Sequence, residues 1–351
     1  MEHSAIDLHK KESQIRIVTE AGEVIDRRVV TRRETFTKVF GGRPQTRILI
    51  EASTESEWVA RHLESLGHEV VVADPNYAAM YGTLTRRIKT DERDVAALTD
   101  ACLQHIYRAS HRRSPARRAI HADLTVREGL VQMRTRVISM TRALTRGEGL
   151  RIQSGATHTY LDRLRAVATS TELRTTLSPL QAVHELLNEE LERADGQIND
   201  IARADVDIAR LMTAPGVGSI TATAFVAALD DVERFRNASR VASYIGLVPR
   251  EYSSGERCRR GRIMRSAQPR LQRMVVQAAW CLWRCKRPEA AALRAWADAV
   301  AQRRGKRVAV IGLARRLARI LFAMWRDQQD FDAARIRDRR GTATIVAART
   351  V

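Results

Sequence analysis

The stretch that decides the fold is residues 47–75, RILIEASTESEWVARHLESLGHEVVVADP. It begins with the apolar run Arg47–Glu51, whose composition is typical of a buried strand. A helix is predicted over Glu55–Leu66, closed by a glycine, and a second buried strand over Val70–Asp74, stopped by a proline. Strand, helix and strand in this order indicate an α/β domain.

The residues before this stretch extend the same pattern. Ala5–Leu8, Ser13–Thr19 and Val24–Val30 are each predicted to form a strand, with a turn at Ala21-Gly22 between the last two. We therefore expect the first hundred residues or so to form a sheet with helices packed on it.

Beyond this region the chain becomes almost wholly helical. Apolar residues recur at helical spacing in Leu130–Leu144 and Leu186–Leu211, which predicts a long antiparallel hairpin with its break near residues 147–159. A bundled core helix and a dimerising coiled coil both produce this pattern, so both readings stay open. A compact, mainly helical domain is expected from about Leu211 to a last helix around Val308–Trp325. The predicted segments are therefore 1–110, 111–208, 209–327 and a polar tail, 328–351.

The charge of the chain points to a polyanionic partner. Its 351 residues carry 60 basic and 41 acidic side chains, a net charge of +19. Such a surface attracts nucleic acid by counterion release. The sequence contains no apolar run long enough to span a membrane, no lipidation motif and no signal peptide, so no membrane partner is expected.

Cysteine usage is typical of a reducing cytoplasm. The four cysteines are too few and too irregularly spaced for a disulfide framework in a chain of this length. Cys281 and Cys285 lie one helical turn apart, but no second cysteine or histidine pair follows at zinc-site spacing. We interpret them as small apolar residues of a helix.

Four acidic residues lie where separate elements begin or end. Asp7 and Glu51 close two predicted strands, whereas Asp91 and Asp94 lie three residues apart at a predicted helix start and so share a face. Each one singly is an ordinary helix cap or a solvated side chain. Four converging carboxylates would repel each other unless cations lay among them, as in a two-metal phosphoryl-transfer site.

Four short motifs surround these residues. They are Ile6-Asp7-Leu8-His9-Lys10, Ile50-Glu51-Ala52-Ser53, Ala73-Asp74-Pro75 and Arg87-Ile88-Lys89-Thr90-Asp91-Glu92-Arg93-Asp94. In order and spacing they resemble the N-terminal domain of the insertion sequence 110 family of transposases, which also contains the Piv-type DNA invertases. The resemblance implies a RuvC-like, ribonuclease-H-type α/β fold in which Asp7, Glu51, Asp91 and Asp94 bind Mg²⁺. One departure is Ala52-Ser53-Thr54, where the family usually carries Ala-Thr-Gly.

The C-terminal part continues the resemblance. Leu211–Ala222 has the pattern of a helix, a turn at Gly216-Val217-Gly218 and a second helix. In a helix-hairpin-helix element such a turn offers backbone N–H groups to a phosphate, although a simple helix connection has the same pattern. Downstream, Ala242–Pro249 and Ser253-Ser254-Gly255 match the family's C-terminal domain, which implies a serine nucleophile at Ser254, with Ser253 as the alternative.

A run of arginines adjoins this serine. Residues 250–273 hold eight arginines and only Glu251 and Glu256 as acidic residues, a pattern suited to holding a DNA backbone. The family usually carries Ser/Thr-Lys-x-Gly where this chain reads Met264-Arg265-Ser266-Ala267. The residues predicted to bind nucleic acid are Lys89, Gly216, Gly218, Arg257, Arg259, Arg260, Arg262 and Arg265.

These features lead to one preferred function and two alternatives. The resemblance implies a bacterial, cytoplasmic, nucleoid-associated transposase that cuts and rejoins donor and target DNA through a serine–DNA intermediate, guided by a bridge RNA. A serine hydroxyl needs activation, which the magnesium-binding acidic residues would supply. Because recombination breaks four strands, we expect a homodimer that assembles into a tetramer. The alternatives are a magnesium-dependent RuvC-like endonuclease or junction resolvase that uses water, and a non-catalytic nucleic-acid-binding protein.

Overall fold

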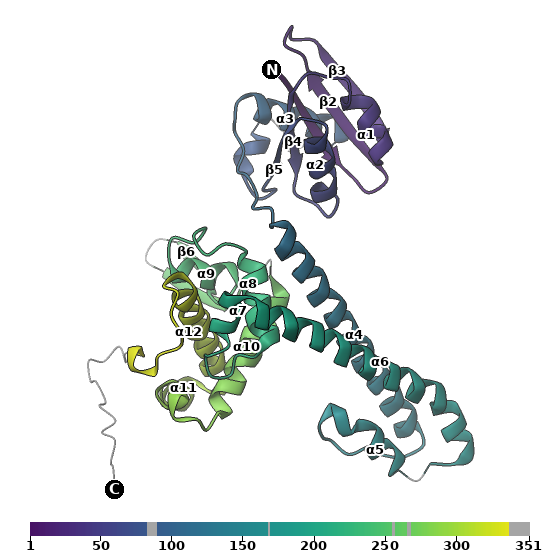
Figure 1. Ribbon diagram of the computed structural model, residues 1–351, viewed down its shortest axis with the longest axis vertical. Helices are drawn as coiled ribbons and strands as arrows, with labels where there is room; N and C mark the ends of the chain where they lie inside the picture. The colour runs from purple at the N-terminus through teal and green to yellow at the C-terminus, as the bar shows by residue number, and fades with distance from the viewer. Residues whose placement is uncertain (83–89, 168, 255–256, 265–267, 337–351) are drawn as a thin grey trace. The chain divides into compact units, whose positions relative to one another are not determined.

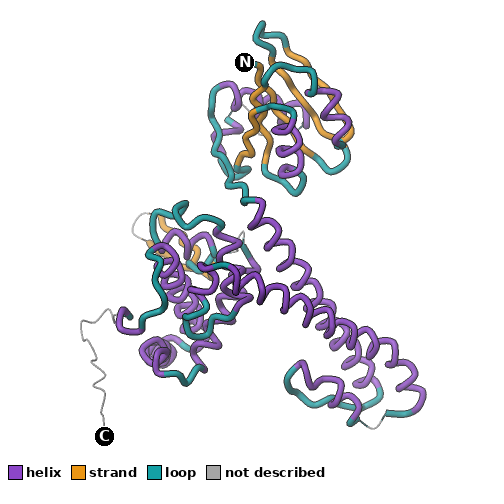
Figure 2. The backbone as a smooth tube through the Cα atoms, viewed as in Figure 1, coloured by secondary structure: helices purple, strands orange, loops and turns teal. Residues whose placement is uncertain are grey.

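The computed structural model describes residues 1–82, 90–167, 169–254, 257–264 and 268–336, with the backbone alone for 251–254, 257–260 and 262. Contacts between Cα atoms divide the chain into two compact units, Met1–Arg113 and a second unit that begins at Ser114. The first unit contains a sheet, and the second is mainly helical (Figures 1 and 2).

The first unit is built on a five-stranded mixed sheet. Its strand order is β3-β2-β1-β4-β5. The pairs β1–β2 and β2–β3 are antiparallel, whereas β1–β4 and β4–β5 are parallel. The strands are β1 (Glu2–Leu8), β2 (Glu12–Val18), β3 (Val24–Val30), β4 (Thr46–Glu51) and β5 (Glu69–Ala73). The prediction is confirmed to within one residue at each end for β2, β3, β4 and β5, which were predicted as Ser13–Thr19, Val24–Val30, Arg47–Glu51 and Val70–Asp74.

Helices cover both faces of this sheet. On one face Ile48 and Ile50 pack with Phe36, Phe40 and other residues of the first two helices, and on the opposite face Leu49 packs with the third. Burial on both faces explains why the residues of β4 form a continuous apolar run. The helices are α1 (Arg33–Phe40), α2 (Ser56–Ser65), the 3₁₀ helix η1 (Ala78–Tyr81) and α3 (Asp91–Leu103). Helix α1 was not predicted.

The second unit begins with a long helical hairpin. Helices α4 (Pro115–Gly147) and α6 (Thr171–Ala204) pack along each other, joined through η2 (Thr157–Thr159) and α5 (Tyr160–Arg165) (Figure 1). The Arg134 side chain of α4 donates to Asn188 of α6 at 3.0 Å. The expected hairpin is therefore confirmed. The predicted helix over Leu186–Leu211 is interrupted at Asp205, because its carboxylate caps a new helix.

The remaining elements form a helical body with one small hairpin of strands. Its core contains α8, whose residues from Ala222 to Leu229 are all buried, and the buried face of α12. The β6–β7 hairpin is antiparallel and was not predicted, because its residues lack alternating apolar positions. The elements are α7 (Val206–Leu211), α8 (Ser219–Leu229), α9 (Ala238–Tyr244), β6 (Pro249–Ser254), β7 (Arg257–Ile263), α10 (Pro269–Arg284), η3 (Pro288–Ala290), α11 (Ala291–Arg304), α12 (Lys306–Arg326) and η4 (Ala333–Arg335).

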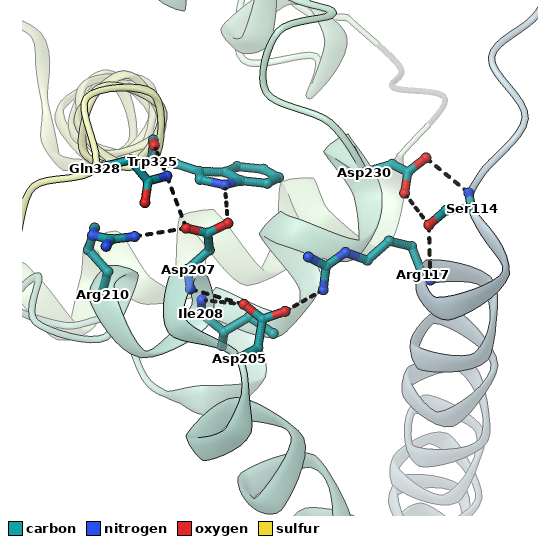
Figure 3. Close-up of polar contacts among 9 residues, drawn as sticks. All are labelled: Ser114, Arg117, Asp205, Asp207, Ile208, Arg210, Asp230, Trp325 and Gln328. Atoms are coloured by element: carbon teal, nitrogen blue, oxygen red, sulfur yellow. Dashed lines mark hydrogen bonds and ion pairs between the residues drawn. The ribbon is translucent and has the colours of Figure 1, made fainter.

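Carboxylates anchor the start of α4 to this body (Figure 3). Asp230, in the sparsely populated region at φ 65°, accepts hydrogen bonds from the backbone N–H and hydroxyl of Ser114, at 3.0 and 2.7 Å. Arg117 donates to Asp205 at 2.6 Å, one turn further along the helix. The first turn of α4 is therefore bound from two sides.

The end of α12 is bound in a similar way. Asp207 accepts from the Trp325 indole N–H at 2.7 Å and from the Gln328 amide at 3.1 Å (Figure 3). The backbone N–H of Phe331 donates to Thr213, and the Phe331 side chain packs against the core. The described part of the expected polar tail, residues 328–336, therefore contacts the helical body. Among the described helices, none combines the length and the apolar character that crossing a bilayer requires.

Candidate functional site

Two strand ends bring carboxylates to one edge of the sheet. Strands β1 and β4 are parallel and paired in register at Ile6 and Ile50. Asp7 and Glu51 each follow one residue later, so they lie at the same edge. Only the pairing of these strands brings together two residues that are 44 positions apart in the chain.

The start of α3 brings two further carboxylates to this edge. Thr90 caps the helix, its hydroxyl accepting from the backbone N–H of Arg93 at 3.4 Å. Asp91 and Asp94 lie in the first turn, where the helix dipole favours negative charge. Asp91 is exposed and Asp94 is buried, and α3 packs against β1. The predicted helix start with its two acidic residues is confirmed.

The carboxylates meet around a histidine. His9 Nε2 lies 3.4 Å from Asp7 Oδ2 and 3.8 Å from Asp91 Oδ1, and one ligand atom from each of the three residues lies within 4.8 Å of the others. Burial raises the pKa of Asp7, His9 lowers it, and the nearby negative charges of Asp94, Asp91 and Glu51 raise it further. Burial is thus the main cause of the raised pKa of Asp7, and the three nearby carboxylates add a repulsion that a cation would relieve.

A tyrosine binds the Glu51 carboxylate. The hydroxyl of Tyr81, the last residue of η1, donates a hydrogen bond to Glu51 Oε2. Burial, together with Glu51, raises the pKa of Tyr81, so the phenol keeps its proton and remains a donor. Sequence reasoning assigned no role to Tyr81 or to His9. His9 could have been noticed because it follows Asp7 by two residues, whereas Tyr81 has no local signal.

The structure thus brings Asp7 and Asp91 together directly and places Glu51 and Asp94 close enough to affect the pKa of Asp7. Carboxylate oxygens are the ligands that Mg²⁺ prefers, so the residues present fit that ion. Lys89 lies outside the described residues.

The candidate nucleophile lies in the second unit, on the β6–β7 hairpin. Ser254 is the last residue of β6 and pairs with Arg257, whereas Ser253 pairs with Cys258. The backbone of Arg257, Arg259, Arg260 and Arg262 belongs to β7, but their side chains, like those of the two serines, lie outside what the structure describes. Gly255 and Arg265 lie outside the described residues altogether.

The two glycines of the predicted phosphate-binding turn have different surroundings. Gly216 has φ +80°, and a Cβ built on it would lie 2.5 Å from the Leu282 nitrogen and 2.7 Å from the Ala278 oxygen of α10. Close packing on α10 therefore accounts for this glycine. Gly218 is the exposed N-cap residue of α8, with no atom near the place of a Cβ. It leaves the N-terminus of α8 accessible.

Among the arginines of residues 250–273 whose side chains the structure describes, Arg270 and Arg273 have a partner in α4. Arg270 donates to Glu128 of α4 at 2.5 Å, and Arg273 contacts the same carboxylate. Burial alone would raise the pKa of Glu128, but the hydrogen bonds and charges of the two arginines outweigh it and hold that pKa below its usual value. These two arginines therefore join α10 to α4.

Comparison with known sequences gives two family matches. Residues 5–147 match the profile of DEDD-type IS110 transposases, and residues 208–294 match the profile described as transposase IS116/IS110/IS902 family. Together the two profiles cover both the acidic cluster and the β6–β7 hairpin.

Curated relatives match along nearly the whole chain. A probable family 20 transposase of Pseudomonas aeruginosa is 29% identical, over 91% of this chain and 95% of the relative. The transposase for insertion sequence element IS1111A of Coxiella burnetii is 26% identical, over 93% and 90%. The transposase for insertion sequence element IS1328 of Yersinia enterocolitica is 25% identical, over 91% and 95%.

Proposed function

The chain belongs to the IS116/IS110/IS902 family of transposases, and from this premise we propose that it cuts and rejoins DNA through a covalent serine–DNA intermediate, with Mg²⁺ bound by its acidic cluster. The observation that carries the proposal is the convergence of Asp7, Glu51, Asp91 and Asp94 at one sheet edge. The strand order, three antiparallel strands followed by two parallel ones, supports a RuvC-like, ribonuclease-H-type assignment of the first unit.

The acidic cluster has the composition of a magnesium site. Asp7, Asp91, Glu51 and Asp94 offer hard oxygen ligands, and their mutual repulsion favours a bound cation. When bound, Mg²⁺ supplies charge neutralisation at the phosphate and acidifies a coordinated hydroxyl. The protein's own part is to hold the carboxylates: Tyr81 orients Glu51, and the first turn of α3 positions Asp91 and Asp94.

The serine step exchanges one phosphodiester bond for another. The Ser254 hydroxyl attacks phosphorus, a P–Oγ bond replaces one P–O bond of the DNA, and the released DNA hydroxyl takes up the proton that the serine loses. Rejoining reverses this exchange with the hydroxyl of another strand, so no external energy source is needed. We take Ser254 rather than Ser253 as the nucleophile because it stands directly before Gly255 in the segment that resembles the family's C-terminal domain.

Trapping the covalent intermediate tests the nucleophile. With a nicked DNA substrate and Mg²⁺, we expect the wild-type chain and Ser253→Ala to form a protein–DNA adduct and Ser254→Ala to form none. Full adduct formation by Ser254→Ala together with loss in Ser253→Ala would transfer the role to Ser253. Strand breakage at the full rate in both variants, with no adduct, would instead indicate water as the nucleophile.

A parallel test addresses the acidic residues. Asp7→Asn and Asp91→Asn each remove one charge with little change of shape. We expect both to lose magnesium-dependent strand breakage, with the circular dichroism spectrum unchanged. Cleavage unaffected by either change would reject the metal site as assigned.

We also propose that the chain binds a structured bridge RNA and works as a dimer that assembles into a tetramer. The resemblance to the family is the basis for the RNA, and the net charge of +19 agrees with a nucleic-acid partner of either kind. Exposed apolar residues on α4 support pairing of two copies: Val126, Met133, Met140 and Leu144 are spaced by seven, seven and four residues, the spacing of a coiled-coil seam. Co-purification of a defined RNA and the mass of the particle in solution test these two points.

A further inference from the structure

His9 is the one residue of the ligand group formed by Asp7, His9 and Asp91 that does not belong to the acidic tetrad. It follows the end of β1, and its Nε2 lies near carboxylate oxygens of both Asp7 and Asp91. Its side chain is 57% exposed, whereas that of Asp7 is 13% exposed. The imidazole, like the 62% exposed Asp91 carboxylate, therefore lies on the solvent side of the cluster, where an ion would still have open coordination positions.

The distances suit coordination of one ion by all three side chains. With metal–ligand bonds of about 2.1 Å, atoms 3.4 and 3.8 Å apart subtend angles of about 110° and about 130° at the ion. Octahedral angles need the two pairs that include His9 Nε2 to close by less than about 1 Å, which rotation of the exposed His9 and Asp91 side chains can supply. The ligand atoms of Asp7 and Asp91 lie within 4.8 Å of each other.

We propose that His9 is a direct ligand, through Nε2, of the ion held between Asp7 and Asp91. The proposal rests on the metal site of the proposed function and adds a nitrogen donor to it. Imidazole binds Mn²⁺ and later transition metals better than it binds Mg²⁺, which prefers oxygen. His9 therefore shifts the ion preference of this site towards Mn²⁺.

Pulsed electron paramagnetic resonance of Mn²⁺ bound to the full chain tests this directly, since a coordinated imidazole nitrogen modulates the electron spin echo. We expect ¹⁴N modulation in the wild type and its loss in His9→Gln. The matched control is His62→Gln, because His62 is on α2 and hydrogen-bonds to Thr37 outside the cluster. His62→Gln is expected to keep the modulation.

Ion affinities give a second readout. Loss of an outer-sphere partner costs about 10–100-fold in metal affinity, so loss of a ligand is expected to weaken Mn²⁺ binding by at least about tenfold. Mg²⁺ binding is expected to change less, because water replaces an imidazole at little cost to an oxygen-preferring ion. The Mn²⁺-to-Mg²⁺ affinity ratio of His9→Gln then falls below that of the wild type.

These measurements distinguish the proposed role of His9 from the proposed metal site on which it rests. Mn²⁺ that binds in the wild type and is lost in Asp7→Asn, but shows no ¹⁴N modulation, overturns the role of His9 and leaves the acidic metal site intact. Modulation that persists in His9→Gln also overturns it. No Mn²⁺ binding in the wild type rejects the metal site and the ligand together.

Discussion

Replacement of Gly216 by alanine distinguishes packing from phosphate binding at the turn between α7 and α8. The added Cβ meets the α10 backbone at 2.5 and 2.7 Å, where neither Leu282 nor Ala278 can yield by rotating a side chain. A left-handed conformation costs a non-glycine residue about 1–2 kcal/mol. Overpacking adds about 1–3 kcal/mol. We therefore expect a loss of about 2–5 kcal/mol in the free energy of unfolding.

For a unit of this size, 1 kcal/mol shifts the melting temperature by about 2–4 °C, so Gly216→Ala is expected to melt about 4–20 °C lower. Differential scanning calorimetry of the full chain measures this shift. Gly218→Ala is the matched control, because φ is −100° there and the place of the Cβ is open. Its cost is that of alanine in place of glycine at an N-cap, about 1 kcal/mol or less.

DNA binding measured below both melting temperatures completes the comparison. If the N-terminus of α8 contacts a phosphate, Gly218→Ala weakens binding more than Gly216→Ala does, since only Gly218 is exposed. A Gly216→Ala variant that melts within about 1 °C of the wild type would refute the packing argument.

Three other substitutions test the acidic cluster, the junction of α4 and α10, and the seam on α4. Tyr81→Phe is expected to weaken Mg²⁺ or Mn²⁺ binding about 10–100-fold in calorimetric titration, as loss of an outer-sphere hydrogen bond does, whereas Tyr77→Phe leaves it unchanged; equal affinities would contradict a positioning role. Glu128→Gln leaves Arg270, 18% exposed, without its counter-charge and is expected to cost about 2–3 kcal/mol of stability in urea unfolding, less than a fully buried pair because of solvent screening. The pKa of Glu128 in the folded protein lies below its usual value of 4.5, so the contribution of this carboxylate to stability is present above pH 4.5 and is lost as the pH falls through the folded pKa. A Glu128→Gln variant with the same acid sensitivity as the wild type would count against this pair. Met133→Glu places a charge on the exposed seam and is expected to halve the particle mass in sedimentation, and an unchanged mass would exclude this face as the dimer contact.

Several elements follow from local sequence pattern. Burial on both faces requires a continuous apolar run, so β4 and β5 can be predicted from Arg47–Glu51 and Val70–Asp74. The helical period of α4 and α6 likewise predicts their hairpin. Helix α1 could not be predicted in this way, because Phe36 and Phe40 alone mark its buried side over two turns. The β6–β7 hairpin could not be predicted either, because β7 consists mainly of arginines and lacks the alternating apolar residues of a typical strand.

The sequence predicts only some of the contacts among the acidic residues. That Asp91 and Asp94 share a helix face follows from their spacing, because a helical turn repeats every 3.6 residues. That Asp7 and Glu51 meet depends on the parallel pairing of β1 with β4, which no local pattern specifies. The hydrogen bond from Tyr81 to Glu51 and the closeness of His9 to Asp91 depend on the same packing.

The distinction has one physical cause. Periodicity and turn chemistry reflect whether each residue faces solvent or core, and the chain carries that information locally, which is how the strands of the sheet and the helical hairpin could be predicted. The four carboxylates were identified through the motifs that resemble a known family. Contacts between distant segments depend on which surfaces fit together once those elements exist. The need for glycine at position 216 is set by the α10 backbone against which it packs, and the partner of Arg270 is set by the approach of α4. Only the tertiary structure decides these contacts.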